Sequence, residues 1–412
     1  MLGAARARMP APDVPLSGLG PPLRVRTRRD YYVPFDVNYG QRNAVFLERP
    51  WAPLRRVVHW GDAVTFLPEP DYDIVHAVNA VPVLSRKPYV MTFSDYMPRV
   101  PEDRYVGWLE HWLRRELLSP RCVALLALSE YAVRQFRHQN RDFPGLPTLE
   151  EKLEVRYPAV AARRSEPKPA PEKELKLLFV GRDFMRKGGP ALVSAHEQLR
   201  ARGVPVTTTI VSSLGWKPND TYVDPPSPEL VAREHARIEQ DGIVHIRNAP
   251  NTEVYALMED ADFFIFPTLH DIFGYVTLEA LACATPVIAT ATNSMPEVIE
   301  EGRSGYLLPL EQDGEIGRWA WTYRTREPGF VEAYEAANRS IADALTERLS
   351  QCWEARADYP ALSAGALERA RTRFSSEIAR ERLEQLYERC RERLPMGRRL
   401  LRRLRRDPQT TA

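Results

Sequence analysis

Glycines and cations gather in residues 181–189, directly after the apolar run 175–180, which is typical of a buried strand. The sequence of this loop is GRDFMRKGG, and a helical pattern begins after it. Arg182 offers a planar fork of hydrogen-bond donors and Lys187 a mobile positive charge, while Gly181 lets the backbone approach a ligand closely. A loop of this kind at the start of a helix can hold a diphosphate. The alternative is an ordinary basic turn on the surface.

Two carboxylates stand eight positions apart in a second loop and helix, after the apolar run 262–267. Asp271 precedes Phe273 and Gly274, and Glu279 falls in the second turn of the helix expected after them. Eight residues span about 12 Å in a helix, so these carboxylates could bind different hydroxyl groups of one elongated ligand. The alternative is that Asp271 only caps the helix and that Glu279 is a paired, partly buried carboxylate.

The elements around these two loops alternate regularly between strand and helix. We predict strands at 175–180, 204–212, 243–246, 262–267 and 285–290, and helices at 190–202, 251–259 and 275–283. Such alternation predicts βαβ units, in which a parallel sheet carries helices on both faces. Ligands of such sheets bind beyond the carboxyl ends of the strands, and both charged loops stand at such ends.

The chain divides by composition into two domains and several shorter segments. We predict a Pro- and Gly-rich leader at 1–22, a first domain at 23–162, a charged, Pro-rich linker at 163–174, a second domain at 175–360, helices at 361–394 and a basic tail at 395–412. Within the first domain we predict strands at 73–78, 89–93 and 123–128 and a helix at 107–118. The best C-terminal helical segments are 361–373 and 376–389.

Composition restricts the classes of function. The 412 residues exceed one ordinary core, and a hydrophobic fraction of 44% with 27% charged residues is normal for a globular protein. A net charge of +2 does not favour nucleic acid as the partner. The four cysteines lie far apart, so we expect neither a zinc site nor a disulfide framework. The first residues have Pro and Gly where the apolar core of a signal peptide would lie, and the sequence contains no run of 18 apolar residues. We therefore predict a cytoplasmic protein that does not span a membrane.

The segment from Asp271 to Glu279, with ALACATPVIAT after it and then MPEVI, resembles the Glu-x7-Glu region of retaining glycosyltransferases of family 4. Upstream, FVGR with Lys187 and Gly188 resembles the diphosphate loop of that family, and GYLLP at 305–309 resembles a strand that follows its motif. The resemblance implies the GT-B architecture: two Rossmann-like domains face each other across a cleft, and C-terminal helices cross back to the first domain.

The resemblance also implies a role for each matching residue. Arg182 and Lys187 would neutralise the diphosphate of a nucleotide sugar, and Asp271 would bind the transferred sugar. The remaining donor-binding residues would be Gly181, Phe273, Gly274, Tyr275 and Glu279, the last of these on the ribose hydroxyls. Because cations would stabilise the leaving diphosphate, we expect no metal and no cofactor besides the nucleotide-sugar co-substrate. A retaining mechanism in which the leaving phosphate takes the acceptor proton needs no protein base.

The sequence departs from the family pattern at several positions. Asp271 stands where Glu is usual, Ala284 where Gly is usual, and Ser94 where many members have His. The first domain opens without the usual Gly-rich turn, and only residues 38–40, Asn-Tyr-Gly, are similar to it. Acceptor-side candidates are therefore Ser94, Asp95 and His76. The acceptor stays open among a glycan, a lipid-linked sugar and a small molecule.

Two other functions remain open from the sequence. A GT-B sugar phosphorylase would use inorganic phosphate, and a non-catalytic homologue would bind nucleotide sugars without transferring them. The basic tail has eight Arg and one Glu between 391 and 406, with Leu400, Leu401 and Leu404 interleaved. This pattern suits peripheral contact with an anionic membrane, or equally a solvated tail.

Overall fold

The computed structural model describes residues 23–28, 44–49, 63–65, 72–83, 85–99, 107–216 and 222–394. Contacts divide the chain into two units. Unit 1 consists of Met1–Leu128, Gln135–Pro158 and Ser376–Ala412, and unit 2 of Ser129–Arg134 and Ala159–Ser375. The predicted leader at 1–22, the turn at 38–40 and the basic tail at 395–412 lie outside the described residues.

Unit 1 is built on a six-stranded sheet in the order β2-β1-β4-β6-β7-β8, whose paired strands are all parallel. Its strands are β1 (Leu23–Arg28), β2 (Ala44–Arg49), β4 (Ile74–Val78), β6 (Tyr89–Phe93), β7 (Cys122–Ala127) and β8 (Leu153–Val155), with a separate pair β3 (Val64–Thr65) and β5 (Val81–Pro82). The helices are α1 (Gly107–Leu118), α2 (Glu130–Asn140), whose first turn falls in unit 2, α3 (Leu146–Glu150) and α11 (Ser376–Glu392).

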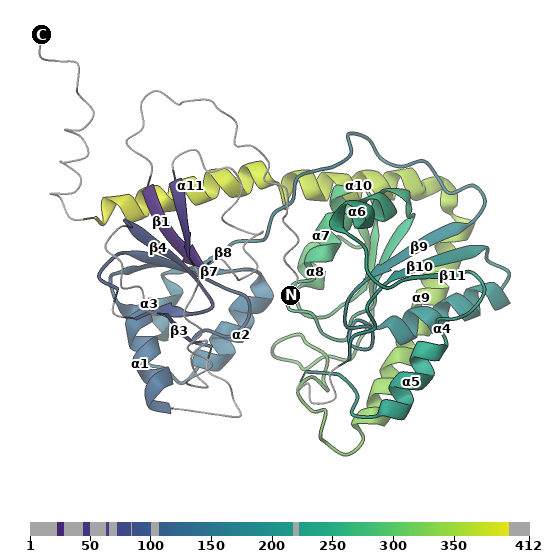
Figure 1. Cartoon of the computed structure of the whole chain (residues 1–412), viewed down its shortest axis with the longest axis horizontal. Helices are drawn as coiled ribbons and strands as arrows, with labels where there is room; N and C mark the ends of the chain where they lie inside the picture. The colour runs from purple at the N-terminus through teal and green to yellow at the C-terminus, as the bar shows by residue number, and fades with distance from the viewer. Residues whose placement is uncertain are drawn as a thin grey trace, which may run out of the picture. The chain divides into compact units, whose positions relative to one another are not determined.

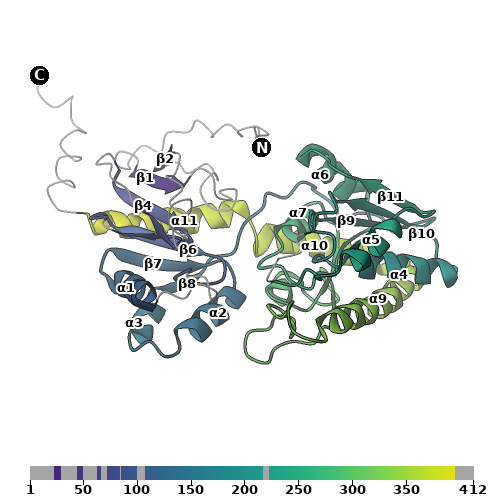
Figure 2. The same ribbon diagram turned by 60° about the horizontal axis from the view of Figure 1, so that its bottom comes forward.

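The last helix returns to the first sheet. Leu383 and Leu386 of α11 share a buried cluster with Leu23, Val25 and Ile74 of β1 and β4. Both ribbon views show α11, drawn in yellow, beside these strands (Figures 1 and 2). The predicted return of a C-terminal helix to the first domain is confirmed.

Unit 2 is built on a second six-stranded parallel sheet, in the order β11-β10-β9-β12-β13-β14. Its strands are β9 (Leu175–Val180), β10 (Val206–Val211), β11 (Ile243–Ile246), β12 (Phe263–Phe266), β13 (Val287–Thr290) and β14 (Gly305–Leu308). Its helices are α4 (Gly189–Ala201), α5 (Pro228–Ala236), α6 (Asn251–Asp260), α7 (Tyr275–Ala282), α8 (Met295–Val298), α9 (Phe330–Glu354) and α10 (Tyr359–Thr372), with a 3-10 turn at Arg356–Asp358.

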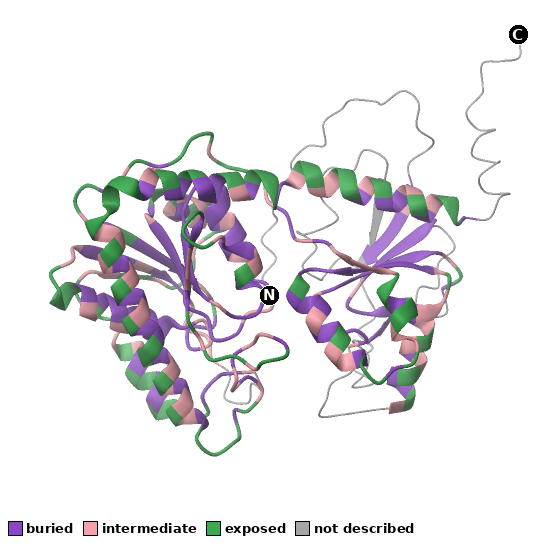
Figure 3. Ribbon diagram, turned by 180° about the vertical axis from the view of Figure 1, so that it is seen from behind, coloured by how far each residue is buried: buried purple, intermediate pink, exposed green. Residues whose placement is uncertain are grey.

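Helices cover both faces of this sheet. Leu192 of α4 and Ile341 of α9 join Phe179 and Ile265 of the central strands in one buried cluster, and α9 lies along α4 (Figures 1 and 2). On the other face lie α6, α7 and α10 (Figure 1). The strands β12 and β13 are buried throughout, whereas the central residues of the edge strand β11 are exposed, as are the outer faces of the helices (Figure 3). The predicted class, α/β with two parallel-sheet units, is confirmed.

Residues 163–174 are held against unit 2 by a buried lysine. Lys168 donates from Nζ to Met258 O at 2.7 Å, Ala261 O at 2.6 Å and Thr285 Oγ1 at 2.6 Å. Burial lowers the pKa of this amine to about 8. The Pro-rich segment that was predicted as a linker therefore packs within unit 2. The boundary between the two units falls after Pro158 instead.

Two local features differ from the sequence expectations. The 25-residue helix α9 was not predicted as a separate element. Ala284, where the family has Gly, has a φ of 55° in the turn after α7. A left-handed turn explains the usual glycine, and here Ala adopts the same conformation. Among the described helices, none combines the length and apolar character needed to cross a bilayer.

Candidate active site

The two charged loops of unit 2 follow adjacent strands at the centre of the sheet. β9 and β12 pair directly, and the chain passes from β9 outward through β10 and β11 before it returns to β12 on the other side. Such a reversal of strand order leaves a crevice at the carboxyl ends of the two strands, where ligands of parallel sheets bind. The sequence predicted the candidate site at these strand ends.

A glycine allows the two loops to touch. Gly188 has a φ of 76°, and a Cβ added there would lie 1.8 Å from the carbonyl oxygen of Pro267. Any other residue would have to push the loop after β9 away from the loop after β12. The Gly-rich character of the first loop therefore serves loop packing as well as access of a ligand to the backbone.

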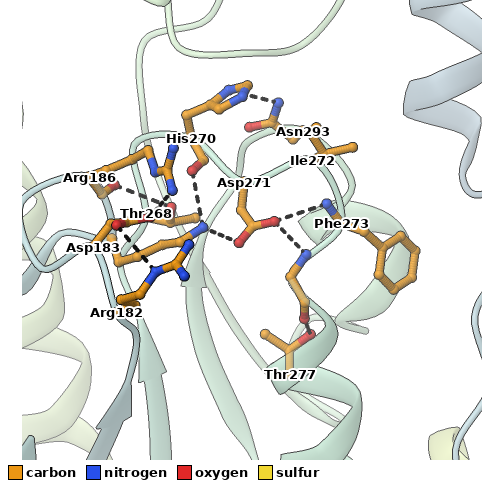
Figure 4. A network of polar contacts seen from close by, with 12 residues as sticks. Arg182, Asp183, Arg186, Thr268, His270, Asp271, Ile272, Phe273, Thr277 and Asn293 are labelled. Atoms are coloured by element: carbon orange, nitrogen blue, oxygen red, sulfur yellow. Dashed lines mark hydrogen bonds and ion pairs between the residues drawn. The ribbon is translucent and has the colours of Figure 1, made fainter. Parts of the chain in front are cut away.

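Lys187 and Asp271, predicted from separate motifs, form an ion pair across the two loops. Lys187 Nζ also lies 3.4 Å from the carbonyl oxygen of His270. The other carboxylate oxygen of Asp271 accepts from the backbone N–H of Phe273 at 3.1 Å and of Gly274 at 2.9 Å. The Asp271 carboxylate thus lies between the lysine amine and the backbone N–H groups of the two residues that precede α7 (Figure 4).

The electrostatics of this pair favour an ionised carboxylate. Burial acts to raise the pKa of Asp271, but the charge of Lys187, their hydrogen bond and the N–H donors outweigh it, so the pKa lies below its ordinary value. Burial lowers the pKa of Lys187, and Asp271 opposes that shift. The lowered pKa keeps the Asp271 carboxylate ionised at neutral pH, where it is the counter-charge of the Lys187 amine.

The two arginines of the first loop differ in their exposure to solvent. Asp183 pairs with Arg186, and both side chains are largely buried. Arg182 lies 3.7 Å from the same carboxylate through its Nε, and its side chain is 68% exposed. Of the three cations of the loop, Arg182 is therefore the one presented to solvent. Asp183 was not predicted as a site residue, although its spacing of three from Arg186 is that of an ion pair on one helical turn.

His270 is enclosed behind the ion pair. Its ring stacks on Tyr222, with centroids 5.0 Å apart, and meets Tyr323 edge-on at 6.1 Å. Nδ1 lies 3.5 Å from the amide nitrogen of Asn293, while burial and the charge of Lys187 lower the pKa of the ring to about 3. The imidazole is neutral and turned away from Asp271 (Figure 4). The ring packs the loop after β12 against Tyr222 and Tyr323.

The helix after the second loop begins at a glycine in the left-handed conformation. Gly274 has a φ of 71°, and a Cβ there would lie 2.8 Å from Met295 Cε. Phe273 is buried, and its ring contacts that of Tyr275 with centroids 5.1 Å apart. The predicted donor-binding residues Phe273 and Gly274 thus directly precede α7, and Tyr275 is its first residue.

Glu279 lies one turn further along α7. Its Oε1 accepts from the hydroxyl of Tyr255 on α6 at 3.3 Å. The guanidinium of Arg163 lies over the ring of Tyr255, 4.0 Å from the ring centroid. Tyr255 and Arg163 were not predicted from the sequence, since no motif joins these three positions.

The acceptor-side candidates belong to unit 1 and have partners within it. His76 is fully buried, and its two ring nitrogens contact Tyr387 Oη and Thr92 Oγ1, each at 2.7 Å. Burial lowers its pKa to about 3. His76 therefore ties α11 to the sheet, and the proposal that it faces an acceptor is wrong. Ser94 donates from its backbone N–H to Asn79 Oδ1 at 3.1 Å and from its hydroxyl to Asp95 at 3.2 Å.

Comparison with known proteins identifies the segment that contains the site. A family model described as "Glycosyl transferases group 1" matches residues 174–318, a range that includes both charged loops and Glu279. Residues 174–318 are therefore similar to group 1 glycosyl transferases. The chain is 32% identical over 178 residues to a D-inositol 3-phosphate glycosyltransferase of Arthrobacter sp. (strain FB24), an alignment that covers 42% of this chain and 40% of that protein. The chain spans less than half the length of the curated relatives it matches first.

Two solved structures share the fold over about nine-tenths of this chain. A glycosyltransferase from Rickettsia africae ESF-5 has a TM-score of 0.59 at 14% identity and covers 90% of this chain and 99% of its own. The Anabaena protein HepE, in complex with UDP, has a TM-score of 0.58 at 14% identity and covers 89% and 99%. At this identity the likeness concerns the fold alone. The candidate site lies within residues 174–318, the segment that the group 1 model matches.

Proposed function

We propose that this protein transfers a sugar from a nucleotide-diphosphate donor to an acceptor hydroxyl, with retention of configuration and without a metal. The observation that carries the proposal is the meeting of Lys187 and Asp271 beside the exposed Arg182, at the reversal of strand order in the segment similar to group 1 glycosyl transferases. A phosphate-binding cation and a sugar-binding carboxylate are needed at adjacent points of one donor, and these two residues are adjacent.

Lys187 and Arg182 act on the phosphate side of the bond that breaks, and Asp271 acts on the sugar side. Breaking the glycosidic bond leaves the electron pair on a phosphate oxygen, where Lys187 and Arg182 stabilise the developing charge. Asp271 accepts a hydrogen bond from the transferred sugar and holds it while the anomeric carbon changes partners. The acceptor oxygen attacks from the face that the phosphate leaves, and its proton passes to that phosphate, so no protein base is required.

The structure of HepE with UDP supports uridine diphosphate as the first nucleotide to try. Glu279, on the second turn of α7, would accept hydrogen bonds from the ribose hydroxyls. For the acceptor we keep the range set by the sequence: a glycan, a lipid-linked sugar or a small molecule. Contact of the basic tail with an anionic membrane belongs to this proposal, and flotation with liposomes, with and without residues 395–412, tests it.

The test of the proposed function is slow donor hydrolysis by the purified full-length protein. A panel of UDP-, GDP-, ADP- and TDP-sugars is incubated with the protein, with and without a chelator, and release of free sugar is followed. We expect hydrolysis of one donor class, unchanged by the chelator and lost in Lys187→Ala. Cleavage that requires inorganic phosphate would indicate a phosphorylase, and nucleotide binding without turnover would indicate a non-catalytic homologue. Either result would overturn the proposal.

A further inference from the structure

Glu279 contacts a tyrosine that no motif of the family-like region includes. The hydroxyl of Tyr255, on the facing helix α6, donates to Glu279 Oε1 at 3.3 Å. This distance is long for a hydroxyl donor, so the hydrogen bond is a modest one. Both side chains are half-buried, which leaves them within reach of a ligand.

The hydroxyl of Tyr255 stays a donor at every working pH. Burial raises the pKa of this phenol, and the charge of Glu279 raises it further. The proton therefore remains on the tyrosine and points at a carboxylate that accepts only. A phenylalanine at the same position would keep the ring and remove this donor alone.

An arginine fixes the ring that carries the hydroxyl. The guanidinium of Arg163 lies 4.0 Å from the centroid of the Tyr255 ring, well within the range of a cation–π contact. Arg163 is itself held at two points: its backbone N–H donates to Ala282 O of α7 at 2.8 Å, and its Nε lies 3.4 Å from Glu259 of α6. Arg163 thus bridges the helices that carry Tyr255 and Glu279.

We propose that Tyr255, held by Arg163, is a positioning residue that orients Glu279 toward the ribose of the donor and so sets the preference for ribose over deoxyribose. The inference rests on the proposed function, since Glu279 is assigned to the ribose there. A carboxylate whose rotamer is fixed before binding loses less entropy when it accepts ligand hydroxyls. A site built around such acceptors discriminates against an analogue that lacks the hydroxyl.

The chain offers a matched control for removal of the hydroxyl. Tyr306 of β14 also lies under an arginine, with Arg348 4.4 Å from its ring centroid, but its electrostatic neighbours are Cys352 and Glu301 and not Glu279. Tyr306→Phe therefore makes the same chemical change under the same kind of cation, away from α7. A general loss of packing would affect both variants.

The experiment is calorimetric titration of full-length wild type, Tyr255→Phe and Tyr306→Phe with UDP, GDP and ADP and with the 2′-deoxy form of each. For the nucleotide that wild type binds, we expect Tyr255→Phe to raise the Kd about threefold, as for loss of one modest hydrogen bond. The ratio of the deoxy Kd to the ribose Kd should fall toward one in Tyr255→Phe and stay at the wild-type value in Tyr306→Phe. The donor KM should rise with kcat unchanged.

Two failures are distinguishable in this design. If wild type binds and prefers the ribose nucleotide, and Tyr255→Phe keeps the same ratio, the positioning role is wrong while the proposed function stands. An equal fall of the ratio in both variants would also overturn the role. If wild type binds none of these three nucleoside diphosphates and does not bind TDP either, the proposed function fails and the inference fails with it.

Discussion

Polar side chains follow the central strands of both units, but those of unit 2 include cations beside a carboxylate, and the three compared in unit 1 do not. In unit 2, Asp271 faces a lysine from the neighbouring loop, and Arg182 is exposed beside them. In unit 1, Asn79 follows β4 and Ser94 follows β6, and they bind each other and Asp95 without a cation among these three residues. The first arrangement holds charge that a ligand can use, whereas the second satisfies its own polar groups and stabilises a turn.

The largest expected effect comes from removing the amine of unit 2. Lys187→Ala should lower kcat by about 10²- to 10³-fold, because the charge that stabilises the leaving phosphate is lost. The matched control is Lys176→Ala, at the opposite end of β9, where the side chain pairs with Asp260 on the surface. Turnover assays on the identified donor, together with thermal melts, check this prediction. An equal fall of kcat in the two variants would mean that Lys187 has no special role among the lysines of unit 2.

The next effect concerns the partner of that amine. Asp271→Asn should lower kcat about 10- to 100-fold, the worth of a hydrogen bond between a charged group and the reacting sugar. The amide oxygen of Asn can still accept from Phe273 and Gly274, so the start of α7 should survive. Single-turnover rates with saturating donor measure the effect, and circular dichroism checks the fold. A normal rate would leave Asp271 as a helix cap only.

Much of this comparison was predictable from local sequence. The loops after 175–180 and 262–267 combine glycine with charge directly after apolar runs, and parallel sheets place such loops together. The pairing of Lys187 with Asp271 was not predictable, because it depends on the close approach at Gly188 and Pro267. In unit 1, His76 lies in an apolar run, and nothing local distinguishes a histidine that meets Tyr387, more than 300 residues away, from one that faces a cleft.

The buried histidines allow the stability of the two units to be compared by pH. His76 and His270 each have a pKa lowered to about 3, so both are neutral in the folded protein. Below the ordinary pKa of about 6.5, these histidines bind protons in the unfolded chain but not in the folded chain. The free energy of unfolding therefore falls as the pH drops from about 6.5 toward about 3. Thermal melts at pH 7, 6 and 5 should show this loss in wild type.

Substitution of each histidine in turn measures how much of this loss of stability at low pH comes from each unit. His76→Gln and His270→Gln should each be less stable than wild type at pH 7, with a smaller fall in Tm between pH 7 and pH 5. A pH dependence that is identical in wild type and both variants would mean that neither buried ring contributes to acid unfolding.

The smallest effect is expected in unit 1. Ser94→Ala removes a hydroxyl that donates to Asp95, and it should change kcat/KM by less than about threefold, which is under about 0.7 kcal/mol. Steady-state assays with the identified donor and acceptor measure it. A large loss with a normal Tm would show that this strand end takes part in the reaction after all.

The central claim, that the strand ends and helix α7 of unit 2 hold a nucleotide-sugar donor, is tested most directly by calorimetry of UDP with wild type, Glu279→Ala and Asp271→Asn. Loss of Glu279 should weaken binding about 10- to 100-fold, since hydrogen bonds from the ribose to a charged group are lost. Asp271→Asn should keep or raise the affinity, because it releases Lys187 to the phosphates while the nucleotide contacts remain. Normal binding by Glu279→Ala, or an equal loss in both variants, would contradict the account.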